Sequence, residues 1–171
     1  MCNLHSYLPA RQHTAFGQVI DSYCQDAHKS LAKINYAPTL HHCGPVGAGI
    51  IMVIMDLLEG HNALSMYTER PLPPPPLIED VRNAIQALHQ KDIVFGDSKG
   101  PNIMICQDKT DQAKVCAMLV DFDWAGKHGE ACYPTTLNDC WDIVWAPGIV
   151  RGGIMRMEHD NFMLEQLSLS V

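Results

Sequence analysis

The sequence predicts an α+β fold, because amphipathic helical segments, short β-rich runs and turn-forming connections succeed one another along the chain. Its 171 residues, of which 47% are apolar, are sufficient for one globular unit with a core of its own. The net charge of −7 comes without a run of Lys or Arg that could neutralise several backbone phosphates. The sequence therefore excludes a nucleic-acid-binding function.

The apolar runs and the cysteines indicate the cellular location of the protein. The longest unbroken apolar stretch, Ala48 to Met55, is far shorter than the roughly 20 residues that cross a bilayer. The first sixteen residues carry scattered polar side chains and do not form a secretory signal. Seven cysteines, an odd number with no C-x-x-C pair, are typical of mostly reduced thiols. We expect an intracellular, cytoplasmic protein that makes no contact with membranes.

The first third of the chain predicts one helix and one hairpin. Apolar residues recur at helical spacing from Tyr23 to Ile34, and Pro38 follows shortly after as a stop. The runs Thr39 to Cys43 and Gly49 to Met55 predict antiparallel strands joined by a turn at residues 44–48. The four prolines Pro73 to Pro76 predict a stiff polyproline II connector, outside any helix.

The rest of the chain predicts two helices and three strands. Apolar residues mark one face of a helix from Leu77 to His89. A final helix is expected within Glu158 to Leu169, with Asp160 or Asn161 as its N-cap. The predicted strands are Ile93 to Phe95, Asn102 to Cys106 and Lys114 to Val120.

Three side chains with oxygen atoms fall at informative places around these three strands. Asp97 closely follows the strand that begins at Ile93, Asn102 comes five residues later and opens a hairpin, and Asp121 follows that hairpin and precedes Phe122. This order resembles the H-x-D-x-x-x-x-N catalytic loop and the D-F-G motif of the protein-kinase-like superfamily.

The resemblance implies a role for each of these residues in phosphoryl transfer. Asp97 would orient the acceptor hydroxyl and accept its proton, and Lys99 would contact the transferred phosphoryl group. Asn102 and Asp121 would hold Mg²⁺, which prefers oxygen ligands and bridges the phosphates of ATP. The segment that would bind the adenine ring, as the hinge does in the family, contains Met55, Asp56 and Leu57.

The run Asp121 to Lys127, with Trp145 to Gly148, is similar to divergent kinase-like proteins of mushroom-forming (basidiomycete) fungi. The resemblance covers about residues 20 to 168. It implies a kinase-like α+β fold truncated at both ends. Residues 1–60 would be the remnant of a small β lobe, with a helix, a hairpin and the hinge, and residues 61–171 an incomplete, mainly helical large lobe. Asp160 would hydrogen-bond the backbone of the catalytic loop.

The sequence also departs from the family's pattern. Phe95 stands where the catalytic loop usually has His, Asp123 replaces the Gly of D-F-G, and Gly148 replaces the Glu of A-P-E. No G-x-G-x-x-G motif and no Lys precede Lys29, and Val19 stands about where the family has its strand Lys. Both phosphate-binding parts of the small lobe are thus missing, so weak nucleotide binding and slow transfer are expected.

These observations leave several functions open. The first is transfer of phosphate from ATP to a Ser or Thr hydroxyl of a protein. The second is an inactive pseudokinase fragment that acts as an interaction module, and the third is a small-molecule kinase of the aminoglycoside or choline type. In the truncated large lobe, a protein partner would cover the apolar side chains of the last helix, which are Phe162, Met163, Leu164 and Leu167.

A metal-binding function is a further alternative. Cys24 and His28 lie one helical turn apart, and His41, His42 and Cys43 are consecutive. The paired-ligand spacing of zinc modules is absent, which favours a core Cys24 and surface histidines instead.

Overall fold

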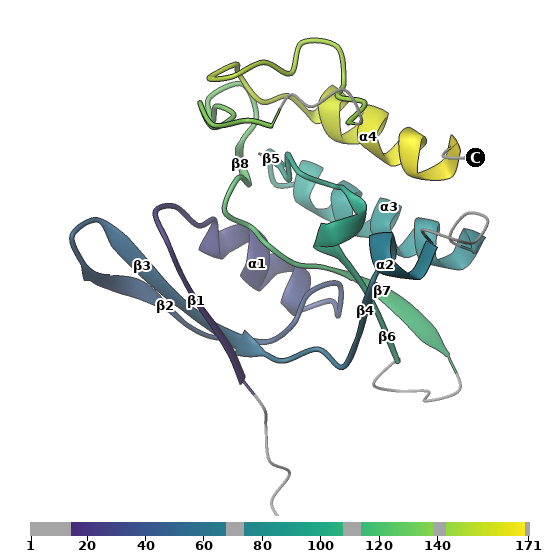
Figure 1. Ribbon diagram of the computed structural model, residues 1–171, viewed down its shortest axis with the longest axis horizontal. Helices are drawn as coiled ribbons and strands as arrows, with labels where there is room; N and C mark the ends of the chain where they lie inside the picture. The colour runs from purple at the N-terminus through teal and green to yellow at the C-terminus, as the bar shows by residue number, and fades with distance from the viewer. Residues whose placement is uncertain (1–14, 68–73, 108–113, 139–142, 170–171) are drawn as a thin grey trace, which may run out of the picture.

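The computed structural model describes residues 15–67, 74–107, 114–138 and 143–169. Within these ranges helices and strands alternate in the mixed α+β architecture that the sequence predicts. A three-stranded sheet with one helix lies at one end of the molecule, and the remaining helices and two small sheets form the other (Figure 1). The division into domains at residue 60 stays a prediction.

The first sheet contains β1 (Ala15–Ile20), β2 (Leu40–Gly47) and β3 (Ile50–Asp56), all antiparallel, in the order β1-β3-β2. Helix α1 (Gln25–Ala32) follows β1 and buries Ala27 and Leu31 in the main core. The predicted helix and hairpin are both present, and the central strand β3 is the most apolar of the three, with Val53 fully buried.

The hairpin turn lies later than the sequence analysis placed it. Strand β2 continues to Gly47, and the two turn residues are Ala48 and Gly49, both with positive φ, as a two-residue primed turn requires. Pro45 is tolerated inside β2 because this strand lies at the edge of the sheet, where the missing N–H breaks no ladder on the outer side.

The second part of the chain centres on helix α3 (Pro75–His89), whose apolar face packs on the sheet of β4 (Gly60–Asn62), β6 (Ile103–Gln107) and β7 (Val115–Leu119). Val81, Ile85 and Leu88 are almost completely buried, as predicted. A short helix α2 (Ala63–Tyr67) and a 3₁₀ turn (Gly100–Asn102) complete this side of the molecule.

Two expectations about helix starts are wrong. Pro75 and Pro76 are the first residues of α3 instead of a connector, because the N–H groups of a first turn have no helical partner and their loss costs nothing. Pro74 alone has polyproline II angles, and Pro73 lies outside the described residues. Helix α4 (Met157–Leu169) begins before Asp160 and Asn161, so neither residue is its N-cap.

Helix α4 packs beside α3 in Figure 1. Met163 and Leu164 are buried, while Phe162 and Leu167 are half-buried and pack against apolar clusters of the same chain. The expectation that these side chains lie exposed is therefore wrong, whereas the protein partner of this lobe stays a prediction. Segments of the chain itself cover them, including a second apolar cluster built around Tyr133 and Met155.

The last two strands, β5 (Ile93–Val94) and β8 (Gly126–Lys127), pair with each other beside the loop that carries Asp97. No helix in the described part of the chain is both long and apolar enough to span a bilayer.

Candidate active site

The loop that carries Asp97 follows β5 and is held by a buried carboxylate. Asp160, only 1% exposed, accepts hydrogen bonds from the backbone N–H groups of Phe95 and Gly96, each at 2.8 Å, and from His89 Nε2 at 2.9 Å. The expected contact between Asp160 and this backbone is thus confirmed. Phe95, at the start of this loop, is fully buried and contacts the ring of Phe122.

The side chain of Asn102 turns back onto Asp97. Its Nδ2 donates to the backbone oxygen and to Oδ2 of Asp97, both at 3.0 Å. Because the amide nitrogen is used in this way, the carbonyl oxygen of Asn102 is the end of the amide available to a cation. The backbone supports the same geometry, since Lys99 N–H donates to Asp97 O and Asn102 N–H donates to Lys99 O.

Lys99 forms an ion pair with Asp97. Its Nζ lies 2.9 Å from Asp97 Oδ1 and also 4.3 Å from the ring centre of Trp145 and 5.4 Å from that of Trp124. Burial raises the pKa of Asp97, while Lys99 and the hydrogen bond from Asn102 oppose this rise. Lys99 is therefore held between a carboxylate and two indole rings.

Asp121 follows β7 and has a positive φ of 68°. The N–H of the preceding Val120 donates to Asn102 O at 3.0 Å, so Asn102 and Asp121 are tied together through the backbone. Burial and the neighbouring Asp121 raise the pKa of Asp123 to about 7. The two carboxyl groups therefore lie close enough to influence each other's ionisation.

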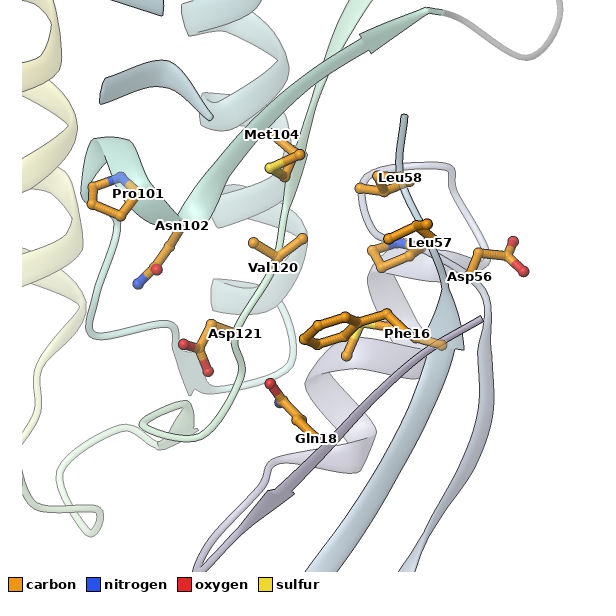
Figure 2. Close-up of a pocket in the computed structure, with 12 residues that line it drawn as sticks. Phe16, Gln18, Asp56, Leu57, Leu58, Pro101, Asn102, Met104, Val120 and Asp121 are labelled. Carbon is orange, nitrogen blue, oxygen red and sulfur yellow. The ribbon is translucent and has the colours of Figure 1, made fainter. Parts of the chain in front are cut away.

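Asn102 and Asp121 line a pocket of about 310 Å³ between the first sheet and the β6–β7 hairpin (Figure 2). Met55, Asp56 and Leu57 also line it, so the structure brings the predicted hinge and the predicted metal ligands to one pocket. Asp97 and Lys99 are not among its described lining residues, and Asp97 is connected to the pocket by the hydrogen bond from Asn102. The catalytic, metal-binding and adenine-binding roles of these residues stay predictions.

Asp56 contributes backbone instead of charge to the pocket. Figure 2 shows its carboxylate directed away from the other lining side chains, and its Oδ1 lies 2.6 Å from His41 Nε2. The N–H of Asp56 donates to Thr39 O at 2.9 Å. The side chains that do face the pocket from this segment are apolar.

Sequence reasoning missed several walls of the pocket. They are Phe16 and Gln18 of β1, Pro38 before β2, Leu58 after β3, and Pro101, Met104 and Val120 in or beside the β6–β7 hairpin. Placing Val19 at the position of the family's strand Lys was wrong, because Val19 is 61% exposed and Gln18 lines the pocket instead. The period of two in a strand could have shown that Phe16 and Gln18 share a face.

Phe122 connects this site to helix α1. Its ring stacks on His28 at a centroid distance of 4.7 Å, and the N–H of Cys24 donates to Phe122 O at 2.9 Å. His28 is fully buried, and its Nε2 lies 2.8 Å from Pro38 O. Burial lowers the pKa of His28.

The alternative metal site does not form. His28 lies in the core, whereas His41 pairs with Asp56 on the sheet. Among the residues described by the structure, no three His, Cys, Asp or Glu side chains are grouped so that they could hold a metal ion.

Comparison with known proteins identifies the fold. No family model matches the sequence, and no curated protein matches it. The kinase PK-1 of Cydia pomonella granulovirus superposes with a TM-score of 0.65 at 14% identity, covering 91% of this chain and 58% of the viral kinase. The kinase domain of Mycobacterium tuberculosis PknI, solved as a double mutant, gives a TM-score of 0.56 at 16% identity, covering 91% of this chain and 62% of that domain.

The chain thus has a protein-kinase-like fold, which confirms the predicted fold class. It spans about three fifths of the length of these two kinases.

Proposed function

We propose that the chain binds ATP with Mg²⁺ in the described pocket. It transfers the terminal phosphoryl group to the hydroxyl group of an acceptor that lies beside Asp97. The acceptor is proposed to be a Ser or Thr side chain of a protein. The observation that carries the proposal is that Asn102 and Asp121 share one pocket with the hinge-like segment while the Asn102 amide is hydrogen-bonded to Asp97. The kinase-like fold supports it.

The residues present fit Mg²⁺. The carbonyl oxygen of Asn102 and the carboxylate of Asp121 are hard oxygen donors at the same end of the pocket. The pKa of Asp123 is raised by burial and by Asp121, which is the behaviour of carboxyl groups that lie close together. In the proposed complex, Mg²⁺ neutralises the phosphate oxygens of ATP.

Asp97 would act as the group that orients the acceptor hydroxyl and takes its proton. Its burial raises its pKa and makes the carboxylate a better proton acceptor than an exposed one. Asn102 Nδ2 fixes the rotamer of Asp97, and Lys99 balances its charge. We propose that Lys99 turns from the indole rings toward the transferred phosphoryl group during the reaction.

The apolar walls would hold the adenine ring. Phe16, Met104 and Val120 come from three different strands or strand ends and converge on the pocket, with Leu57 at its side (Figure 2). Met55 is a further apolar lining residue. A flat aromatic base would bury apolar surface against these side chains.

Calorimetry with ATP and Mg²⁺, followed by a phosphate-transfer assay on protein, aminoglycoside and choline acceptors, tests the proposal. We expect Asp97→Asn to bind ATP with Mg²⁺ but to lose transfer, and Asp121→Asn to lose the Mg²⁺-dependent part of binding. Asp26→Asn, which removes the same charge from the exposed face of α1, is the matched control. Transfer that survives in Asp97→Asn would contradict the role of Asp97.

A pseudokinase is the second candidate, and one observation favours it. The lining side chains within the described part of the chain include no Lys or Arg. Binding of nucleotide without transfer to any acceptor would support this candidate.

We also propose that the chain is related to the divergent kinase-like proteins of mushroom-forming fungi, because the run Asp121 to Lys127 is similar to theirs. A cytoplasmic location is proposed as well.

A further inference from the structure

Gln18 is the polar side chain that β1 contributes to the pocket. Figure 2 shows its amide directed toward Asp121 across the pocket. Its Nε2 is buried and has no hydrogen-bond partner in the part of the chain that the structure describes. Buried amide groups are normally paired, so an unpaired one in a pocket wall indicates a group that waits for a ligand.

The charges around Gln18 limit what this ligand can be. Among the lining residues that the structure describes, the charged ones are Asp121 and Asp56, and Asp56 turns away and pairs with His41. The nearest described ammonium group on the catalytic loop, that of Lys99, is held against Asp97 and two indole rings. The polar end of the pocket is therefore neutral or negative, and it opposes a polyanion that arrives without a cation.

We propose that Gln18 sets the ligand preference of the pocket. The pocket recognises the nucleoside part of a ligand, and the phosphates of the ligand add little to its affinity. The inference rests on the proposed nucleotide binding and specifies its ligand class. A Gln amide can present either its oxygen or its nitrogen, because its terminal torsion is broad and roughly two-fold. It can hydrogen-bond a ribose or a phosphate oxygen, but it supplies no positive charge.

Two variants of β1 distinguish the effect of a positive charge inside the pocket from the effect of the same charge on the exposed face of the strand. Gln18→Lys places an ammonium group opposite Asp121, whereas Val19→Lys adds the same charge to the exposed face of β1. Calorimetry measures the affinities of adenosine, of ATP alone and of ATP with Mg²⁺ for each protein, and thermal unfolding checks that both variants fold.

In the unchanged protein, adenosine and ATP with Mg²⁺ should bind within about tenfold of each other, and ATP alone should bind most weakly. Gln18→Lys should raise the ratio of ATP to adenosine affinity by about tenfold or more, while Val19→Lys should leave it unchanged. If Gln18→Lys still binds adenosine but leaves the ratio of ATP to adenosine affinity unchanged, the proposed role of Gln18 is overturned and nucleotide binding is not. Failure of all three ligands to bind any of the proteins would instead overturn the proposed function and this inference with it.

A second observation, independent of the pocket, concerns the β6–β7 hairpin. Cys106 and Cys116 are directly paired across the two strands, and their Sγ atoms lie 3.7 Å apart. Cα atoms of directly paired residues in antiparallel strands are about 4.5 to 5.5 Å apart, a separation that a disulfide can span. Both thiols are on the same face of the hairpin, so a small rotation of the side chains brings the sulfurs into bonding distance.

We infer that Cys106 and Cys116 form an intrachain disulfide when the protein meets a low-molecular-weight disulfide such as oxidised glutathione. The less buried Cys116 attacks first as a thiolate and forms a mixed disulfide, releasing one glutathione. The thiolate of Cys106 then attacks the Cys116 sulfur and displaces the second glutathione. The two cysteines lose two electrons and two protons, which the oxidant takes up as two thiols.

Treatment with oxidised glutathione, followed by alkylation and peptide mass spectrometry, tests this inference. We expect a peptide pair joined through Cys106 and Cys116, reversed by dithiothreitol. Cys106→Ser should retain a glutathione adduct on Cys116, and Cys132→Ser, at an exposed cysteine, should leave the crosslink unchanged. The inference would be overturned if Cys106 and Cys116 were both still alkylated after a treatment in which oxidised glutathione modifies Cys132.

Discussion

The carboxylate of Asp160 accepts a hydrogen bond from the backbone N–H of Gly96 at 2.8 Å, although the two residues are 64 positions apart in the sequence. The same carboxylate receives the N–H of Phe95 and the Nε2–H of His89. One buried anion on α4 thus holds the start of the loop that carries Asp97 and the end of α3.

Replacing Asp160 should cost stability because it leaves its buried donors unpaired. We expect Asp160→Ala to lower the free energy of unfolding by about 3 kcal/mol or more, since each hydrogen bond to a charged group contributes about 1.5 to 3 kcal/mol. Denaturant unfolding measures the change. Asn161→Ala, at the exposed next position of the same helix, is the control and should change the free energy by less than about 0.5 kcal/mol. Equal losses in the two variants would show that helix propensity, not the anion, carries the effect.

Gly96 should not tolerate a side chain. Its φ is +84°, and a Cβ at this position would overlap with the terminal methyl group of Met155. Gly129 has a similar φ of +74° but open space around it, so Gly129→Ala reports the backbone strain alone, about 1 to 2 kcal/mol. We expect Gly96→Ala to lose more stability than Gly129→Ala in chemical denaturation. Identical losses would mean that Met155 moves aside without cost.

Acid should destabilise the protein through His28. Burial lowers the pKa of His28 in the folded state, so the unfolded chain binds more protons as the pH falls below about 6.5. The stabilising contribution of the neutral ring is present above that pH and is lost on acidification toward the folded-state pKa. Burial also lowers the pKa of His159, which acts in the same direction.

We expect the free energy of unfolding to fall between pH 7 and pH 5, and to fall less steeply in His28→Gln. Unfolding in urea at several pH values measures both slopes. Parallel slopes would assign the acid sensitivity to other groups.

Removing the charge of Asp121 should change the pKa of the neighbouring Asp123. Burial and then Asp121 raise the pKa of Asp123 to about 7, so Asp121→Asn should lower the pKa of Asp123 toward its ordinary value. Asn tolerates the left-handed backbone at this position, and the fold should be retained. Carboxyl-carbon NMR titration measures the pKa, and the unchanged signal of the exposed Asp26 serves as reference.

The same variant should weaken Mg²⁺-dependent ATP binding by about tenfold or more, because even residues outside the metal's own ligands commonly cost that much. Calorimetry with and without Mg²⁺ separates this effect from binding of the base. A normal Mg²⁺ dependence in Asp121→Asn would place the cation elsewhere.

Local patterns predicted the regular elements well. Helix α3 was found because its apolar residues recur over four turns, and β6 and β7 were found to within one residue of their ends. The start of α3 was missed because proline was taken to exclude a helix, although it is accepted in a first turn.

Features that depend on how distant elements pack were harder to predict. The contact of Asp160 with the loop joins segments that no periodicity connects, and only the family resemblance indicated it. The placement of Val19 failed because the alternation along β1 was not used to decide which side chains face inward. Met104 was missed as a pocket wall because the sequence does not say which face of β6 meets the first sheet.

Strand β1 supplies two walls of the pocket, Phe16 and Gln18, yet in the described sheet it pairs only with β3, and most of its side chains are exposed. Such a strand can separate from its neighbour at a small fraction of the cost of global unfolding, so its amides should be among the first in the sheet to exchange with deuterium. A ligand that bridges β1 and the hairpin would slow this exchange. The deuterium uptake of residues 15–20 would then report occupancy of the pocket directly, even for a protein that transfers no phosphate.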